Sequence, residues 1–96
     1  MNDITIQELR DRLDKGEDDF VLIDVREPHE RAEFNIGGQH IPLGTLPSNL
    51  NNLEEAKDQE VIVYCRSGNR SGMACDYLRQ QGFSNVRNLL GGMMSW

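Results

Sequence analysis

Apolar residues along this chain fall into short runs that are separated by segments of helical periodicity. Two segments, Phe20–Val25 and Glu60–Cys65, are dominated by apolar residues and predict strands that are buried on both faces. Gln39–Pro42 predicts a brief strand and Val86–Leu90 a last one. The alternation predicts an α/β domain with a central, mainly parallel sheet and helices on both of its faces.

The first two expected helices carry start and stop signals. Thr5 and Glu8 have the spacing of a capping box, and the helix that follows them should end at Gly16. Pro28 suits the first turn of a short second helix, which should run to about Phe34. Both helices therefore begin at positions that the local sequence marks.

Two more helices are expected in the second half of the chain. Leu46, Leu50 and Leu53 are spaced for one helical face, where Pro47 fits only in the first turn. The segment Arg70–Gln81 should form the helix after the central strand. Its core-facing residues are expected to be Met73, Ala74, Tyr77 and Leu78.

Length and composition limit the organisation and the partners of the chain. Its 96 residues suit a single domain, 1–96, with one core. The formal net charge is −6 and the basic residues form no run, so we expect no nucleic-acid partner. No apolar run is long enough to cross a membrane and no secretion signal is visible, so we expect no membrane partner. A cysteine set among arginines suits a reducing compartment, which predicts a cytoplasmic protein.

Cys65 stands where the central strand meets the helix that follows it. A loop of small and basic residues, Arg66 to Arg70, comes directly after the cysteine. The backbone amides of such a loop, the positive end of the helix dipole and two guanidinium groups all favour a thiolate over a thiol. These features indicate a nucleophilic cysteine. The alternative is a small apolar residue that ends a buried strand.

Four segments, in order along the chain, resemble the rhodanese-like sulfurtransferases. Y-C-R-S-G-N-R-S (Tyr64–Ser71) resembles the active-site loop of that family, and L-I-D-V-R-E-P-H-E (Leu22–Glu30) resembles its second-strand signature. I-G-G-Q-H-I-P-L (Ile36–Leu43) is similar to the middle loop. Leu78–Phe83 and Asn88–Trp96 are similar to the C-terminal part. Together these segments span nearly the whole chain, so the resemblance implies a rhodanese-like fold.

The resemblance also implies a sulfurtransferase that works in two half-reactions. The Cys65 thiolate would take the outer sulfur of a donor such as thiosulfate, which forms a persulfide. A thiol, cyanide or a sulfur-carrier protein would then accept that sulfur. We expect no cofactor, and no His/Cys/carboxylate cluster in the sequence indicates a metal site. The residues expected to bind the substrate are Arg66, Ser67, Gly68, Asn69 and Arg70.

Residues outside the loop have supporting roles in this interpretation. Asp24 and Arg26 resemble a pair that supports the active-site loop from the neighbouring strand end. The alternative is direct contact with the substrate, which a carboxylate would disfavour for an anionic donor. His40 matches a histidine of the middle loop and is expected to be structural, with a general base as the alternative. His29 is expected to be solvated and Cys75 to lie in the core.

Two other functions are weighed against small-donor sulfur transfer. Protein tyrosine phosphatases and their relatives have a similar loop, but their signature is C-x5-R, whereas Cys65 and Arg70 are spaced C-x4-R. The resemblance implies that the shorter loop fits a sulfur atom and the longer one a phosphoryl group. The segment His29–Leu43 also resembles rhodanese domains fused behind adenylyltransferases that activate sulfur-carrier proteins. The second alternative is therefore a relay or interaction module, which takes persulfide from a partner protein and turns over small donors slowly.

Overall fold

Four parallel strands form the centre of the molecule. The computed structural model describes residues 3–96. Its strands are β1 (Val21–Asp24), β2 (Gln39–His40), β3 (Glu60–Tyr64) and β4 (Asn85–Asn88), and they lie in the order β2-β1-β3-β4. This arrangement confirms the predicted parallel sheet.

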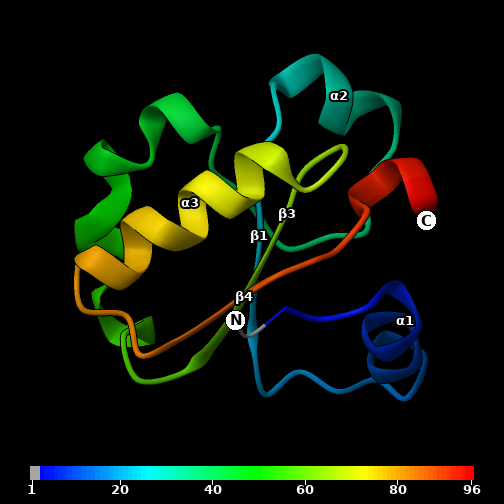
Figure 1. The fold of residues 1–96 in the computed structure, drawn as a ribbon, viewed down its shortest axis with the longest axis horizontal. Helices are drawn as coiled ribbons and strands as arrows, with labels where there is room; N and C mark the ends of the chain where they lie inside the picture. The colour runs from blue at the N-terminus through cyan, green and yellow to red at the C-terminus, as the bar shows by residue number, and fades with distance from the viewer. Residues whose placement is uncertain (1–2) are drawn as a thin grey trace.

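Helices cover both faces of this sheet (Figure 1). The α-helices are α1 (Ile6–Asp14), α2 (Pro28–Glu33) and α3 (Asn69–Gln80). Shorter 3₁₀ segments are η1 (Leu43–Thr45), η2 (Pro47–Ala56) and η3 (Gly92–Ser95). In Figure 1, α1 lies on one side of the strands, whereas α3 and the green η segments lie on the other. Among the described residues, no helix combines the length and the apolar character needed to span a membrane.

The side chains of β3 divide between the two cores. Ile62 and Tyr64 belong to a cluster that includes Leu9 of α1. Val61 and Val63 belong to a second cluster, which receives the buried residues of α3 and η2. Successive residues of a strand point to opposite faces, so a continuous apolar run serves both clusters. The continuous apolar run of β3 therefore reflects burial on both faces of the sheet, as the sequence predicted.

The predicted helix starts are confirmed. The Thr5 hydroxyl accepts a hydrogen bond from the Glu8 amide at 3.1 Å, and the Glu8 carboxylate accepts one from the Thr5 amide, which completes the capping box of α1. Pro28 occupies the first turn of α2, where its missing N–H costs no hydrogen bond. Both starts need only neighbouring residues, which explains why the sequence was sufficient.

The helix expected around Leu46–Leu53 is a 3₁₀ segment instead. Ser and Asn residues follow Pro47, and such side chains compete for backbone hydrogen-bonding groups. The side-chain amide of Asn49, for example, donates to the Thr45 carbonyl at 2.8 Å. This competition explains the irregular segment, although Leu53 is buried as expected.

Met73 does not face the core, and that prediction was wrong. Its side chain is 62% exposed, whereas the buried residues of α3 are Ser71, Ala74, Cys75 and Leu78. The helix begins after the Cys65 loop, and the face that carries Ser71, Ala74, Cys75 and Leu78 is the one that is buried. The last strand also ends earlier than expected, at Asn88, and Leu90 is largely exposed.

The carboxyl ends of the strands gather the segments that carry the candidate chemistry. β1, β3 and β4 end at the same edge of the sheet because all three are parallel. The next residues lead into α2, the Cys65 loop and η3, which lie near one another at the upper end of the molecule in Figure 1. Sites in parallel sheets form at this edge.

Candidate active site

The Cys65 sulfur is buried inside the turn between β3 and α3. It accepts a hydrogen bond from the Gly68 amide at 3.1 Å and one from the Ser71 amide at 3.3 Å. The Ser71 hydroxyl lies 3.3 Å from the same sulfur. Gly68 has a φ of 103°, which a residue with a Cβ rarely adopts, and this conformation closes the ring of amides. The loop is therefore shaped around the sulfur atom.

Burial and hydrogen bonding have opposite effects on the Cys65 thiol. Burial raises its pKa because the thiolate loses its hydration. The Ser71 hydroxyl and the amides of Ser71, Gly68 and Ser67 outweigh that effect, so the pKa of Cys65 is lowered overall. The two arginines of the loop are not among the main causes, which differs from the expectation based on the sequence.

The Arg70 side chain binds α2. Its guanidinium donates to both carboxylate oxygens of Glu30, at 2.6 and 2.8 Å. This contact is the main cause that lowers the pKa of Glu30 to about 2. The ion pair joins α2 to the first turn of α3. Glu30 was not singled out in the sequence, since its partner stands 40 residues away.

Ser71 and Asn88 connect the loop to the end of β4, and neither was proposed as a site residue from the sequence. The Ser71 hydroxyl donates to the Asn88 side-chain oxygen at 2.5 Å. The Asn88 side-chain amide donates to the Gly68 carbonyl at 3.1 Å. One asparagine therefore holds the hydroxyl beside the sulfur and also the glycine that closes the ring. Asn88 is the last residue of β4, whereas the sequence placed it inside a strand that ran to Leu90, so no local signal marked it.

The 3₁₀ segment η3 packs against the outer side of the same loop. The Met93 amide donates to the Cys65 carbonyl at 3.0 Å, and the Met94 amide donates to the Arg66 carbonyl at 2.8 Å. Gly92 is buried at this contact. The carbonyls of the loop are thus paired outward while its amides point inward to the sulfur.

Asp24 and Arg26 form a buried ion pair at the end of β1. The Arg26 guanidinium donates to both Asp24 carboxylate oxygens at 2.9 Å. Burial raises the pKa of Asp24, but the hydrogen bonds and the charge of Arg26 lower it overall. Arg26 also donates to the carbonyl of Phe34 at 2.6 Å, just beyond α2. The direct contacts of the pair thus hold α2, which in turn presents Glu30 to Arg70.

The other residues singled out in the sequence lie outside the Cys65 loop. A ring nitrogen of His40 lies 2.8 Å from the Arg26 carbonyl, which suits the structural role expected for it. His29 is exposed. Cys75 is buried in the core as expected, and burial raises the pKa of its thiol to about 12. No group of His, Cys, Asp and Glu side chains suited to hold a metal ion occurs within residues 3–96.

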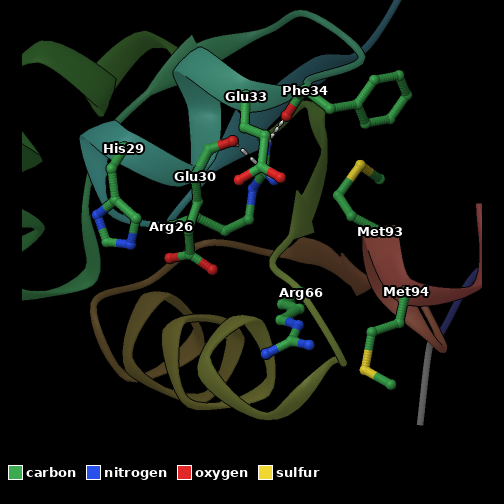
Figure 2. A pocket seen from close by; sticks show the side chains of 8 residues that line it. All are labelled: Arg26, His29, Glu30, Glu33, Phe34, Arg66, Met93 and Met94. Carbon is green, nitrogen blue, oxygen red and sulfur yellow. Dashed lines mark hydrogen bonds between the residues drawn. The ribbon is translucent and has the colours of Figure 1, made fainter.

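Arg66 lines an open hollow of about 650 Å³ beside the loop (Figure 2). The other lining residues come from the end of β1, from α2 and from η3; they are Arg26, His29, Glu30, Glu33, Phe34, Met93 and Met94. Cys65 is not part of this lining, but it precedes Arg66 in the chain. Ser67 and Asn69 are exposed at the surface of the loop. The hollow therefore lies beside Arg66, the residue that follows Cys65.

Known proteins with the same fold and similar sequences include sulfurtransferases. A sulfurtransferase of Allochromatium vinosum is 41% identical over 97 residues, which cover 100% of this chain and 88% of that protein. The adenylyltransferase and sulfurtransferase MOCS3-2 of Zea mays is 35% identical over 99 residues, which cover 97% of this chain and 20% of that protein. A crystal structure of a rhodanese-like domain protein from Staphylococcus aureus has a TM-score of 0.88 at 32% identity and covers 100% of this chain and 91% of that one.

These relatives support a transferase activity that moves sulfur. The profile of the Rhodanese-like domain matches residues 5–96, which is nearly the whole chain. The fold and the sequence agree over the same residues, so the chain belongs to the rhodanese-like family.

Proposed function

We propose that this protein transfers sulfane sulfur through a persulfide on Cys65. The observation that carries the proposal is the buried sulfur, which faces two amides and a hydroxyl within 3.3 Å. Such donors stabilise a thiolate and equally a terminal sulfur that carries negative charge. A strand-end cysteine that served only for packing would not need them.

In the first half-reaction the Cys65 thiolate attacks the outer sulfur of a donor such as thiosulfate. A bond forms between Sγ and that sulfur, and the S–S bond of thiosulfate breaks. The electron pair of the broken bond leaves with sulfite. Arg66 is the free cation of the loop that would contact the oxygens of the donor, because Arg70 is already paired with Glu30.

In the second half-reaction a nucleophilic acceptor attacks the outer sulfur of the persulfide. The bond between Sγ and that sulfur breaks, and Cys65 leaves as the thiolate that started the cycle. No oxidant or reductant is consumed. The lowered pKa of Cys65 makes it a good leaving group as well as a nucleophile.

The direct test is the mass of the Cys65 peptide after incubation with thiosulfate. A persulfide adds about 32 Da, and cyanide should remove that mass as thiocyanate. Cys65→Ser should show no gain and no sulfite release. Cys75→Ala is the matched control, and it should behave like the unchanged protein because Cys75 is a buried core thiol. A mass gain that persisted in Cys65→Ser, or that vanished in Cys75→Ala, would assign the sulfur to the other cysteine.

The second candidate function is a relay that receives sulfur from a partner protein. Phe34 and Met94, which are 50% and 67% exposed, stand at the edge of the hollow and would suit contact with another protein. Steady-state turnover with thiosulfate and cyanide should be compared with transfer from a persulfide-loaded cysteine desulfurase. Fast transfer from the desulfurase together with slow thiosulfate turnover would favour the relay.

We place this activity in a single domain, 1–96, in the reducing cytoplasm. Both cysteines are free thiols. A thiol that must cycle between thiolate and persulfide needs a compartment that keeps it reduced. Labelling of free thiols in freshly lysed cells, with detection of Cys65, is the measurement that checks this location.

A further inference from the structure

The hollow beside the loop contains two charged side chains that the fold does not pair. Of its charged residues, Arg26 is bound to Asp24 and Glu30 is bound to Arg70. The guanidinium of Arg66 and the carboxylate of Glu33 have no ion pair or hydrogen bond within the described part of the chain. Figure 2 shows Glu33 on the α2 side of the hollow and Arg66 on the loop side. A ligand between them meets one positive and one negative charge.

One side of the hollow is apolar, and the hollow has room for an organic molecule. Phe34, Met93 and Met94 lie along the right side of Figure 2, with Phe34 at the top and Met94 at the bottom. The volume of about 650 Å³ falls within the range of small-molecule sites, roughly 300 to 1,000 Å³. A thiosulfate ion has no apolar surface and no positive group, so it would leave the methionines and Glu33 without a contact.

From this arrangement we infer that the hollow selects the sulfur acceptor, and that the preferred acceptor is a small thiol with both a carboxylate and an ammonium group. Arg66 contacts the carboxylate and Glu33 contacts the ammonium. The carbon chain of the thiol lies against Phe34 and Met93. The inference rests on the proposed function, since it concerns the second half-reaction of a Cys65 persulfide.

The chemical step is a displacement at sulfur. The acceptor thiolate attacks the outer sulfur of the Cys65 persulfide, a new S–S bond forms on the acceptor, and the bond to Sγ breaks. Cys65 keeps the electron pair, and the acceptor leaves as a persulfide. Arg66 and Glu33 change neither bond directly. They act as specificity residues because they determine which thiols reside beside the loop.

Thiols that differ only in charge provide the test. Cys65 is first loaded with thiosulfate, or with inorganic polysulfide where a variant loads poorly, and excess donor is removed. The loaded protein is then mixed with 2-mercaptoethanol, 3-mercaptopropionate, cysteamine or cysteine, and the loss of the persulfide is followed by mass in a single turnover. Each rate is divided by the rate of the unchanged protein with the same thiol, which removes the intrinsic reactivity of the thiol.

Reversing the charge of Glu33 and reversing that of Arg66 should shift the preference between cationic and anionic thiols in opposite directions. Glu33→Lys should slow cysteamine relative to 3-mercaptopropionate by roughly three- to tenfold, the size expected for reversing one solvent-exposed ion pair. Arg66→Glu should slow 3-mercaptopropionate relative to cysteamine by a similar factor. Either change should slow cysteine, which carries both groups. Higher ionic strength should reduce all of these ratios, because exposed charges are screened.

Matched controls separate the local contact from the overall charge of the protein. Glu55→Lys and Lys15→Glu make the same changes in net charge at exposed positions that do not line the hollow. If each control shifts the ratios as much as its partner variant, the inference is overturned while the proposed function stands. If the unchanged protein shows no mass gain on Cys65 with either donor, the proposed function fails, and the inference fails with it.

Discussion

Burial and hydrogen bonding compete at Cys65, and the balance depends on single donors. The Ser71 hydroxyl and three backbone amides lower the thiol pKa against the effect of burial. The amides are fixed by the fold of the loop, so a side-chain substitution barely alters them. The Ser71 hydroxyl has a single proton, and both the sulfur and the Asn88 side-chain oxygen lie within reach of it. It is the side-chain group beside the sulfur that a point mutation can remove.

Ser71→Ala should raise the pKa of Cys65 and slow sulfur transfer at neutral pH by roughly tenfold, which corresponds to the loss of one hydrogen bond to a charged group. The rate of alkylation by iodoacetamide, measured against pH, reports the thiol pKa directly. The inflection should move to higher pH in the variant.

Two further variants calibrate that experiment. Ser84→Ala removes a hydroxyl whose one hydrogen bond within residues 3–96 is to the Lys57 carbonyl, far from the loop, and should leave the inflection unchanged. Arg70→Ala should move it upward by less than Ser71→Ala, because Arg70 is held by Glu30. A larger shift from Arg70 than from Ser71 would mean that charge, and not hydrogen bonding, activates the thiol.

At the scale of the elements, the loop is held between α2, β4 and η3. Glu30 of α2 binds Arg70, Asn88 of β4 binds the Gly68 carbonyl, and two amides of η3 bind the carbonyls of the loop. These elements lie outside the loop and far apart in the sequence. Their contacts hold the loop in place from three sides. η3 comes closest to the backbone of the loop at Gly92.

Gly92→Ala should destabilise the protein by about 2 kcal/mol, the typical cost of forcing an extra methyl group into a packed site. A Cβ at this position would lie 2.6 Å from the Arg66 carbonyl oxygen, and the residue has a φ of 54°. To relieve the clash, η3 must move away from the loop, so sulfur transfer should fall as well. Urea unfolding and single-turnover rates measure the two effects.

Gly44→Ala is the matched control for that change. A Cβ on Gly44 would meet no heavy atom within 4 Å. Its stability should therefore stay within about 0.5 kcal/mol of the unchanged protein. Equal stability of the two variants would show that η3 does not pack tightly on the loop.

Across the whole molecule, the charged side chains at the two ends of the parallel strands differ in how they are paired. At the carboxyl ends of the strands, Arg66 and Glu33 have no ion pair with any of residues 3–96. At the amino ends of the strands, the Glu60 carboxylate binds Arg12 at 2.7 and 2.8 Å and Arg87 at 2.8 Å. This cluster ties α1, β3 and β4 together, so the charges at the amino ends of the strands contribute to stability.

Glu60→Gln should lower the free energy of unfolding at pH 7 by about 2 kcal/mol, the scale of hydrogen bonds to charged groups. The hydrogen bond from Arg12 is the main cause that lowers the pKa of Glu60 in the folded state. The stabilisation is therefore complete above the ordinary carboxyl value of about 4.3, and it is lost as the pH falls through the lowered pKa. Urea unfolding of both proteins across this pH range is the measurement.

The difference in the free energy of unfolding between Glu60→Gln and the unchanged protein should narrow as the pH falls, since Glu60 then becomes protonated and neutral. Glu54→Gln is a suitable control, because the Glu54 side chain is mostly exposed and pairs only with Lys57 three residues away. Its effect should be below about 1 kcal/mol. A Glu60→Gln effect that stayed constant down to low pH would mean that packing, and not charge, causes it.

The sequence by itself determined the features that depend on neighbouring residues. Apolar runs marked the strands, and the Thr5 capping box and Pro28 marked helix starts. The position of Cys65 after β3 marked it as the candidate nucleophile. These features could be predicted because strand burial, helix capping and loop geometry each involve a few consecutive residues. The resemblance to a family then supplied the remaining expectations for the loop.

Only the tertiary structure decided which distant groups meet. Glu30 and Arg70 are 40 residues apart, and Ser71 and Asn88 are 17 apart, so no local pattern pairs them. The packing of α3 on the sheet likewise decided which of its faces is buried, and it leaves Met73 exposed. The physical reason is common to all three cases: parallel strands bring their carboxyl ends to one edge, and the contacts made there depend on the packing of whole elements.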